Sequence, residues 1–179
     1  SFALSRRDPD YVPRARATQA LEETRRSGAM PPELQSVQKS LSIPDMGRVQ
    51  IGSVLFANKP GDGSAREQAA SCQKVLGGFA NICYSYATKR YRSNCINWGI
   101  LPFTIDEGTP FDYADGDCVF VPDVRRAVEE AREDIPAKVI RKDGSVEDLM
   151  LHIRGLTQDE REIILDGCLM NYYAARIAD

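Results

Sequence analysis

Ser64 and Arg66 are the residues whose types and spacing best suit chemistry on an acidic substrate. They follow a tight loop at residues 59–63, whose two glycines allow positive φ angles and a close approach of a ligand to the backbone. A helix-forming run begins at Ala65, so its free N–H groups and the positive end of its dipole face the loop. Such a helix start binds carboxylate or phosphate, and the arginine adds a planar cation that matches a carboxylate. The pattern predicts an anion site beside the Ser64 hydroxyl.

Two interpretations of Ser64 are open. In the first it is the N-cap of the expected helix, because Glu67 follows three residues later at the capping-box spacing and serine caps are common. In the second its hydroxyl belongs to the anion site, where backbone N–H groups and a cation stabilise its alkoxide. The loop is neither a Walker A loop nor a dinucleotide-binding fingerprint, and local chemistry does not decide between the two roles.

Alternating strands and helices must position this loop. A strand at 49–56, apolar throughout its second half, ends just before the loop, and a second buried strand is expected at 79–84. A strand–loop–helix–strand unit of this kind forms parallel pairs. Further strands are expected at 100–105, 118–121, 137–141 and 146–153, and helices at 11–26, 33–41, 65–76, 94–98, 124–132 and from Thr157 to about residue 176.

Composition restricts the class of protein. The chain has 179 residues and a net charge of −3, which gives no support for nucleic-acid binding, and no apolar run approaches the length of a membrane span. We expect a helical extension or linker at residues 1–45 and one domain at 46–179. The chain begins at Ser1 without a methionine, so we expect it to be a fragment of a longer protein.

The cysteines and the only histidine bear on metal and nucleophile chemistry. Five cysteines without a Cys-x-x-Cys spacing suit reduced thiols in the cytoplasm, and argue against an iron–sulfur or zinc site built by this chain alone. His152 lies inside a predicted strand and is expected to be structural, because a Ser-His-Asp triad would require it to reach Ser64. The acidic loop at 106–117 lacks the EF-hand spacing and is expected to be solvated.

Three segments resemble motifs of the aconitase superfamily, in the same order. Gly61-Asp62-Gly63-Ser64-Ala65-Arg66-Glu67 resembles the Gly-x-Gly-Ser-Ser-Arg-Glu signature, and residues 76–82 and 91–103 resemble two further motifs. The run at 149–152 with Leu156-Thr157 is similar to the end of aconitase itself. The resemblance implies an α/β fold, the swivelling β/β/α domain, with a mixed-sheet or barrel-like β core flanked by helices.

The resemblance also implies a function and roles for the loop residues. It implies the substrate-binding and catalytic-base domain of a hydro-lyase that dehydrates and rehydrates a hydroxy-polycarboxylate. Ser64 resembles the base that removes the proton α to a carboxylate, Arg66 resembles a carboxylate-binding residue, and Ala65 and Gly63 lie beside them in the substrate-binding loop. Ala65 replaces a serine and Gln68 replaces a histidine of the usual pattern, so we expect a substrate preference that differs from citrate.

The resemblance places the cofactor and the main partner outside this chain. A [4Fe–4S] cluster, held by other domains and not by this chain, binds the substrate hydroxyl in the superfamily. The expected partners are the cluster-bearing domains of the same protein, or a large subunit, and a small polycarboxylate, with no membrane and no nucleic acid. Two alternatives stay open: a free small subunit of an isopropylmalate-type isomerase, and a non-catalytic RNA- or protein-binding relative.

Overall fold

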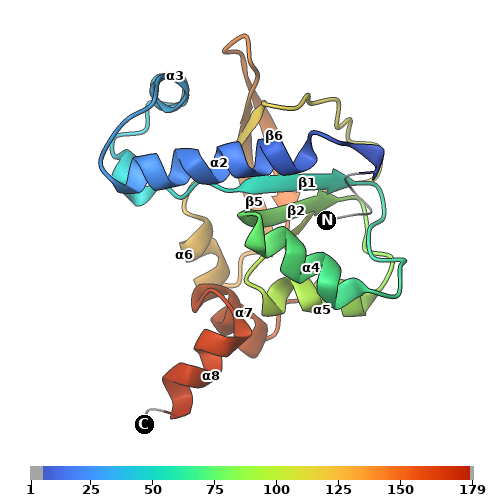
Figure 1. The fold of residues 1–179 in the computed structure, drawn as a ribbon. Coiled ribbons are helices and arrows are strands. Elements are labelled where there is room, and N and C mark those ends of the chain that lie inside the picture. The colour runs from blue at the N-terminus through green and yellow to red at the C-terminus, as the bar shows by residue number, and fades with distance from the viewer. Residues whose placement is uncertain (1–5, 178–179) are drawn as a thin grey trace.

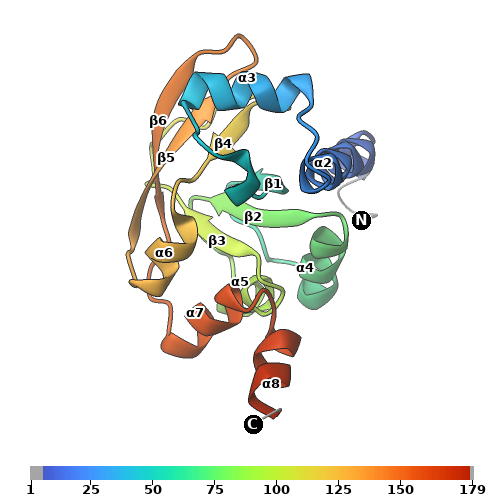
Figure 2. The ribbon, with the colours of Figure 1, turned by 90° about the vertical axis from the view of Figure 1, so that its left-hand side faces the viewer.

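The structure, a computed structural model, describes residues 6–177, so the ends of the two predicted units, 1–5 and 178–179, lie outside the described residues. The described part has an α/β fold with one mixed sheet of strand order β1-β2-β3-β6-β5-β4, flanked by helices, which confirms the predicted fold class (Figures 1 and 2). The sheet is open, with β1 and β4 at its edges. Its strands are β1 (Ser53–Ala57), β2 (Gly78–Cys83), β3 (Leu101–Thr104), β4 (Cys118–Phe120), β5 (Asp134–Ile140) and β6 (Val146–His152).

One half of the sheet is parallel. β1 pairs with β2, and β2 pairs with β3, both in parallel, as the strand–loop–helix–strand pattern predicted. The prediction was wrong about where β1 begins, because it starts at Ser53 and not at residue 49. Val49 and Ile51 instead pack against the buried side chains of Leu34 and Met46. These apolar residues therefore belong to a separate hydrophobic cluster outside the sheet.

The other half of the sheet is antiparallel and joins the first through one residue pair. β3 pairs with β6 only at Thr104 and His152, and the two halves run in different directions in Figure 2. β5 and β6 form the predicted hairpin, with Ile140 opposite Val146. Pro102 was expected to mark an edge or a bulge, but it lies in the interior strand β3. Because β6 pairs with β3 only at Thr104, Pro102 has no pairing partner in β6.

Helices cover the sheet and form most of the C-terminal part. The helices are α2 (Tyr11–Arg26), α3 (Pro32–Leu41), α4 (Arg66–Val75), α5 (Lys89–Asn97), α6 (Val124–Glu129), α7 (Gln158–Leu165) and α8 (Leu169–Ile177), with a 3₁₀ turn η1 (Met46–Arg48). α4 and α5 lie side by side under the parallel half, and α8 extends away from the body (Figures 1 and 2).

Three helix predictions need correction. The helix expected at 94–98 begins earlier, at Lys89, where Thr88 caps its first turn through Tyr91 N. The helix expected at 124–132 is shorter and ends at Glu129. The last helix is not continuous to residue 176, because Gly167, at φ +90°, separates α7 from α8.

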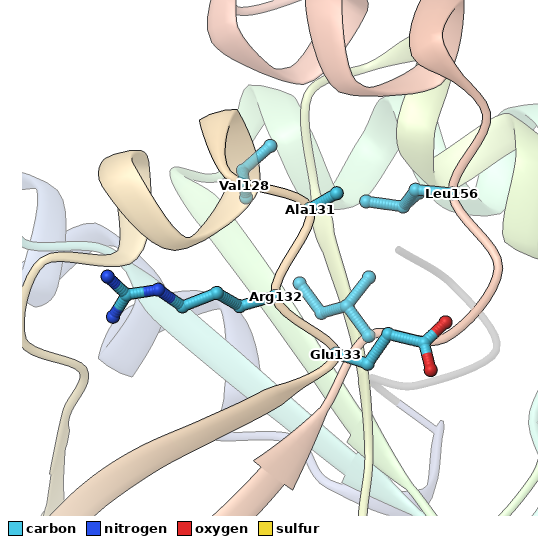
Figure 3. A pocket seen from close by; sticks show the side chains of 6 residues that line it. Val128, Ala131, Arg132, Glu133 and Leu156 are labelled. Atoms are coloured by element: carbon cyan, nitrogen blue, oxygen red, sulfur yellow. The ribbon is translucent and has the colours of Figure 1, made fainter.

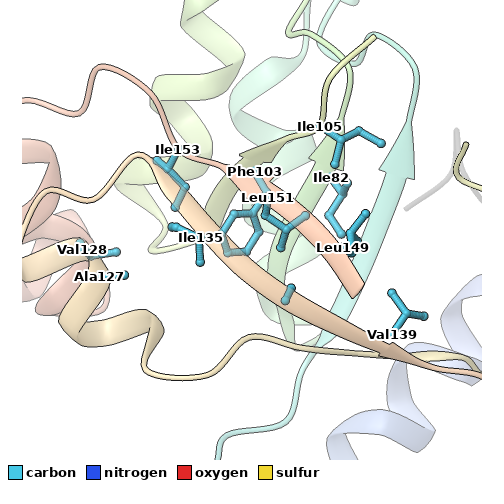
Figure 4. Close-up of a cluster of buried hydrophobic side chains, with 11 residues drawn as sticks. Ile82, Phe103, Ile105, Ala127, Val128, Ile135, Val139, Leu149, Leu151 and Ile153 are labelled. Atoms are coloured by element: carbon cyan, nitrogen blue, oxygen red, sulfur yellow. The ribbon is translucent and has the colours of Figure 1, made fainter. Parts of the chain in front are cut away.

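The main core lies between the two halves of the sheet and α6 (Figure 4). Residues from the strands and their flanks interdigitate there, which fixes the parallel half against the β5–β6 hairpin. Its buried members are Ile82, Phe103, Ile105, Ala127, Val128, Ile135, Ala137, Val139, Leu149, Leu151 and Ile153.

The segment before β1 is tied to the rest of the chain by hydrogen bonds. The carboxylate of Glu22 in α2 accepts from Ile51 N at 3.0 Å, and Gln19 Nε2 donates to Val75 O at 3.1 Å. Tyr11 and Ala15 of the same helix are buried. The division of the chain at residue 45 stays a prediction. Among residues 6–177, no helix is both long enough and apolar enough to cross a membrane.

Candidate functional site

The loop that carries Ser64 and Arg66 connects β1 to α4 at the carboxyl end of a parallel strand. This is the edge at which open α/β sheets bind ligands. The loop after β2 emerges at the same edge and holds the first loop by backbone bonds, from Tyr84 N to Asn58 O at 3.2 Å and from Ala87 N to Pro60 O at 2.9 Å. Two sequence-adjacent βα units therefore build one surface.

Ser64 is exposed and is not the N-cap of α4, so the capping prediction was wrong. Ala65 occupies the N-cap position, without a side-chain capping bond, and helical geometry begins at Arg66. Glu67 does not close a capping box; its carboxylate instead accepts from Trp98 Nε1 at 2.5 Å. The Ser64 hydroxyl is thus left at the surface next to a helix start that has no cap of its own.

Arg66 is half-buried and lies over its own loop. Its Nε donates to the Gly61 carbonyl oxygen at 3.1 Å, which leaves both terminal amino groups of the guanidinium available for a carboxylate. Gly61 has a φ of +98°, and a Cβ added there would lie 2.5 Å from Tyr91 Cβ. Glycine is therefore needed at this position both for the backbone conformation and for the contact with α5.

Gly63 and Ala65 flank Ser64, and both are exposed. A Cβ added at Gly63 would meet nothing within 4 Å, so the space beside this position is open. Ala65 presents only a methyl group where the aconitase-like signature has a second hydroxyl. Gly63, Ser64 and Ala65 are exposed and directly precede the half-buried Arg66, and the roles of all four stay predictions.

His152 lies in β6, at the seam of the sheet. Its ring is buried, with Nδ1 2.7 Å from Asp134 Oδ1 and Nε2 3.4 Å from Asp106 Oδ1. The Nδ1 contact joins the end of β6 to the start of β5. A role in holding the seam accounts for the histidine.

The cysteines do not fit a cluster site built by this chain. Cys83 and Cys95 are buried, and burial raises the pKa of each thiol to about 11, which disfavours the thiolate that iron requires. In the part of the chain that the structure describes, no three His, Cys, Asp or Glu side chains are grouped so that they could hold a metal ion.

Two pockets lie away from the loop. A small one of about 70 Å³ opens beside α6, where Val128, Ala131 and Leu156 meet the side chains of Arg132 and Glu133 (Figure 3). A second, more open one runs along the β5–β6 hairpin and contains the Arg141–Glu147 ion pair. Neither is lined by residues 61–68, and Gly63, Ser64 and Ala65 of the loop are exposed.

Comparisons with known proteins identify the family. A profile of the family described as the aconitase C-terminal domain matches residues 35–108, which include the loop, α4 and α5. Residues 35–108 belong to the aconitase C-terminal domain family. The matched segment contains all three motifs on which the resemblance rested.

Relatives of the aconitase-like domain are similar over most of this chain. Aconitate hydratase A of Bradyrhizobium diazoefficiens is 31% identical over 132 residues, and that of Legionella pneumophila is 31% identical over 131 residues, covering 72% and 70% of this chain. The chain matches only 14% of the length of each relative. Among solved structures, a 3-isopropylmalate dehydratase (leuD) from Methanocaldococcus jannaschii is 25% identical, with a TM-score of 0.46, over 90% of this chain and 87% of that one.

Proposed function

We propose that this aconitase-like domain supplies the catalytic base and a carboxylate-binding arginine to a hydro-lyase acting on a hydroxy-polycarboxylate. The observation that carries the proposal is the loop of the matched family segment. There, the exposed Ser64 lies beside the start of α4, which has no side-chain cap. Two residues later comes Arg66, whose terminal amino groups stay available for a carboxylate. The cluster-bearing part lies outside this chain, either as other domains or as a large subunit.

In the proposed reaction, Ser64 Oγ as alkoxide takes the proton α to a substrate carboxylate. The C–H electron pair becomes the new C=C bond while the C–O bond breaks and the hydroxyl leaves. A serine alkoxide is a strong base in water, so it needs stabilisation before substrate binds. The free N–H groups at the start of α4 and the Arg66 guanidinium supply positive charge at that position.

Arg66 has a second role on the substrate. As a proton leaves the carbon next to a carboxylate, negative charge builds up on the carboxylate oxygens, and a guanidinium held beside them binds this state more tightly than the ground state. We assign departure of the hydroxyl to the cluster-bearing part, because in the aconitase superfamily the cluster binds the substrate hydroxyl. We expect the chain alone to be inactive.

Ala65 bears on the choice of substrate. The missing hydroxyl removes one hydrogen-bond donor from the loop, and a binding site that loses a partner for a substrate hydroxyl or carboxylate disfavours that substrate. We therefore propose a substrate other than citrate. A cytoplasmic location belongs to the same proposal and is supported by the free state of all five cysteines. The small-subunit and the RNA- or protein-binding alternatives stay predictions.

The test uses the complete protein with its cluster reconstituted without oxygen. Citrate, isocitrate, isopropylmalate and homologous acids are offered in deuterated water, and NMR follows both dehydration and exchange of the α-proton. Turnover of one acid, lost in Ser64→Ala with the cluster absorbance unchanged, is the expected result. An intact cluster with no turnover or α-proton exchange on any of these acids would exclude the proposed function.

A further inference from the structure

Thr88, the N-cap residue of α5, connects this helix to the loop that carries Ser64. Thr88 Oγ1 accepts from Tyr91 N at 3.3 Å and donates to the Gly61 carbonyl oxygen at 3.1 Å. The same carbonyl accepts from Arg66 Nε. The hydroxyl therefore joins the first turn of α5 to the carbonyl that orients the guanidinium, and its single hydrogen is used in doing so.

A second contact set reaches the other end of the loop from the end of α5. Trp98 Nε1 donates to Glu67 Oε1 at 2.5 Å. Asn94, with its amide turned so that both groups are satisfied, accepts from Glu67 N at 2.9 Å and donates to Arg90 O at 3.1 Å. Glu67 directly follows Arg66, so the first turn of α4 is held at both its backbone and its side chain.

α5 is a firm support for these contacts. Tyr91, Cys95 and Ile96 are buried on one side of the helix, and Ala70 of α4 packs in the same cluster. A helix fixed by packing moves little relative to the sheet, so groups that project from it hold their positions. By contrast, Gly63, Ser64 and Ala65 are all exposed.

We propose that Thr88 and Trp98 are positioning residues, which hold the two ends of the Ser64–Arg66 loop at Gly61 and Glu67. The inference rests on the proposed function and extends it, because it gives Trp98 of the motif at residues 91–103, and Thr88 three positions before that motif, a role in the reaction. Neither residue touches substrate. They act by keeping the guanidinium and the serine at a fixed separation, and a shift of about 1 Å in a catalytic group can cost two orders of magnitude in rate.

The first test compares Thr88→Val with Thr88→Ser in the complete protein. Valine keeps the shape and removes the hydroxyl, whereas serine keeps the hydroxyl. We expect Thr88→Val to lower kcat/KM about 10- to 100-fold, with much of the loss in KM because carboxylate binding is weakened, and Thr88→Ser to restore most of it. A purely structural role would reduce only the fraction of active protein, which lowers the apparent kcat and leaves KM unchanged.

The second test removes the other contact. Trp98→Phe keeps an aromatic ring and deletes only the indole N–H, and we expect a loss of kcat/KM similar to that of Thr88→Val. If both variants keep wild-type kcat and KM in an enzyme that Ser64→Ala inactivates, the positioning roles are excluded while the proposed function stands.

A spectroscopic measurement distinguishes failure of the positioning proposal from failure of the proposed function. Trp98 is the only tryptophan, so the 179-residue chain gives a single indole N–H signal in a ¹⁵N-labelled sample. We expect this proton to exchange slowly with water and to shift upfield in Glu67→Ala, and to shift in Thr88→Val but not in Thr88→Ser. A signal that is insensitive to Glu67 and Thr88 would overturn the positioning proposal, whether or not the complete protein turns over any acid.

Discussion

Arg66 and Gly61 are joined by a 3.1 Å hydrogen bond from the guanidinium Nε to the carbonyl oxygen. The side chain therefore turns back over the loop that precedes it, and the loop backbone itself sets the direction of the cation. Because only Nε is used, the flat edge formed by the terminal amino groups is kept for a carboxylate.

Arg66→Lys keeps the positive charge but loses both the bond to Gly61 and the two-pronged geometry. In the complete protein we expect kcat/KM to fall by about 100-fold or more, with an increase in KM, in steady-state assays on the substrate that the wild type uses. Arg16→Lys, at an exposed position on α2, is the matched control and should change neither constant. Equal kinetics for the two variants would show that Arg66 does not bind the substrate.

Ser64→Ala separates a catalytic hydroxyl from a helix cap. Since Ser64 makes no capping bond to α4, we expect the free energy of unfolding to change by less than about 0.5 kcal/mol while activity falls by about 10²- to 10⁴-fold or more. Thr157→Ala is the comparison, because Thr157 and Glu160 form a complete capping box, and it should cost about 1 kcal/mol. Urea unfolding measures both. A loss of stability at Ser64 as large as that at Thr157 would restore the capping interpretation.

Gly61→Ala should destabilise the protein, whereas Gly63→Ala should not. A non-glycine residue at φ +98° costs about 1–3 kcal/mol, and the added methyl group also displaces Tyr91. At Gly63 the added Cβ meets nothing, so a change within about 0.5 kcal/mol is expected. Thermal and urea unfolding check the difference. Similar stabilities for the two variants would mean that the Gly61–Tyr91 contact is absent.

Glu22 should make stability depend on pH. Burial raises the pKa of its carboxyl, but hydrogen bonds from Arg25, Ile51 N and Arg26 outweigh burial and leave the folded-state pKa below the ordinary value of 4.5. The carboxylate thus adds stability above about pH 4.5, and this contribution is lost as the pH falls through the lower folded-state pKa.

The matching variant is Glu22→Gln. We expect it to reduce the free energy of unfolding by about 1–3 kcal/mol at neutral pH, with the difference from wild type shrinking as the pH falls below about 4. Urea unfolding between about pH 3 and pH 7 gives the curve. A difference that does not change with pH would mean that the charge of Glu22 is not involved.

Local patterns predicted most elements because local physics decides them. The helix at Tyr11–Arg26 has the predicted bounds, since a run rich in Ala, Arg and Glu is stopped by Ser27-Gly28. The capping box at Thr157 and the hairpin around Asp143-Gly144 formed as expected, because the interacting groups are within a few residues of each other.

The wrong predictions share a dependence on distant contacts. α7 and α8 are separate, and Gly99 lies so close to this break that a Cβ on it would be 1.9 Å from Gly167 O. The expected capping box at Ser64 does not form, and the Glu67 carboxylate that the box requires instead accepts from Trp98, more than 30 residues away.

The sequence alone determined the family segment, the parallel βα unit and the identity of the loop residues, because motif, hydrophobic period and turn chemistry are local properties of the chain. Only the tertiary structure decided how the loop is held. The bonds from Thr88 to Gly61 and from Trp98 to Glu67 join residues 27 and 31 positions apart. Such contacts exist only after α4 and α5 have packed side by side, and no periodicity within either helix encodes which polar groups will then meet.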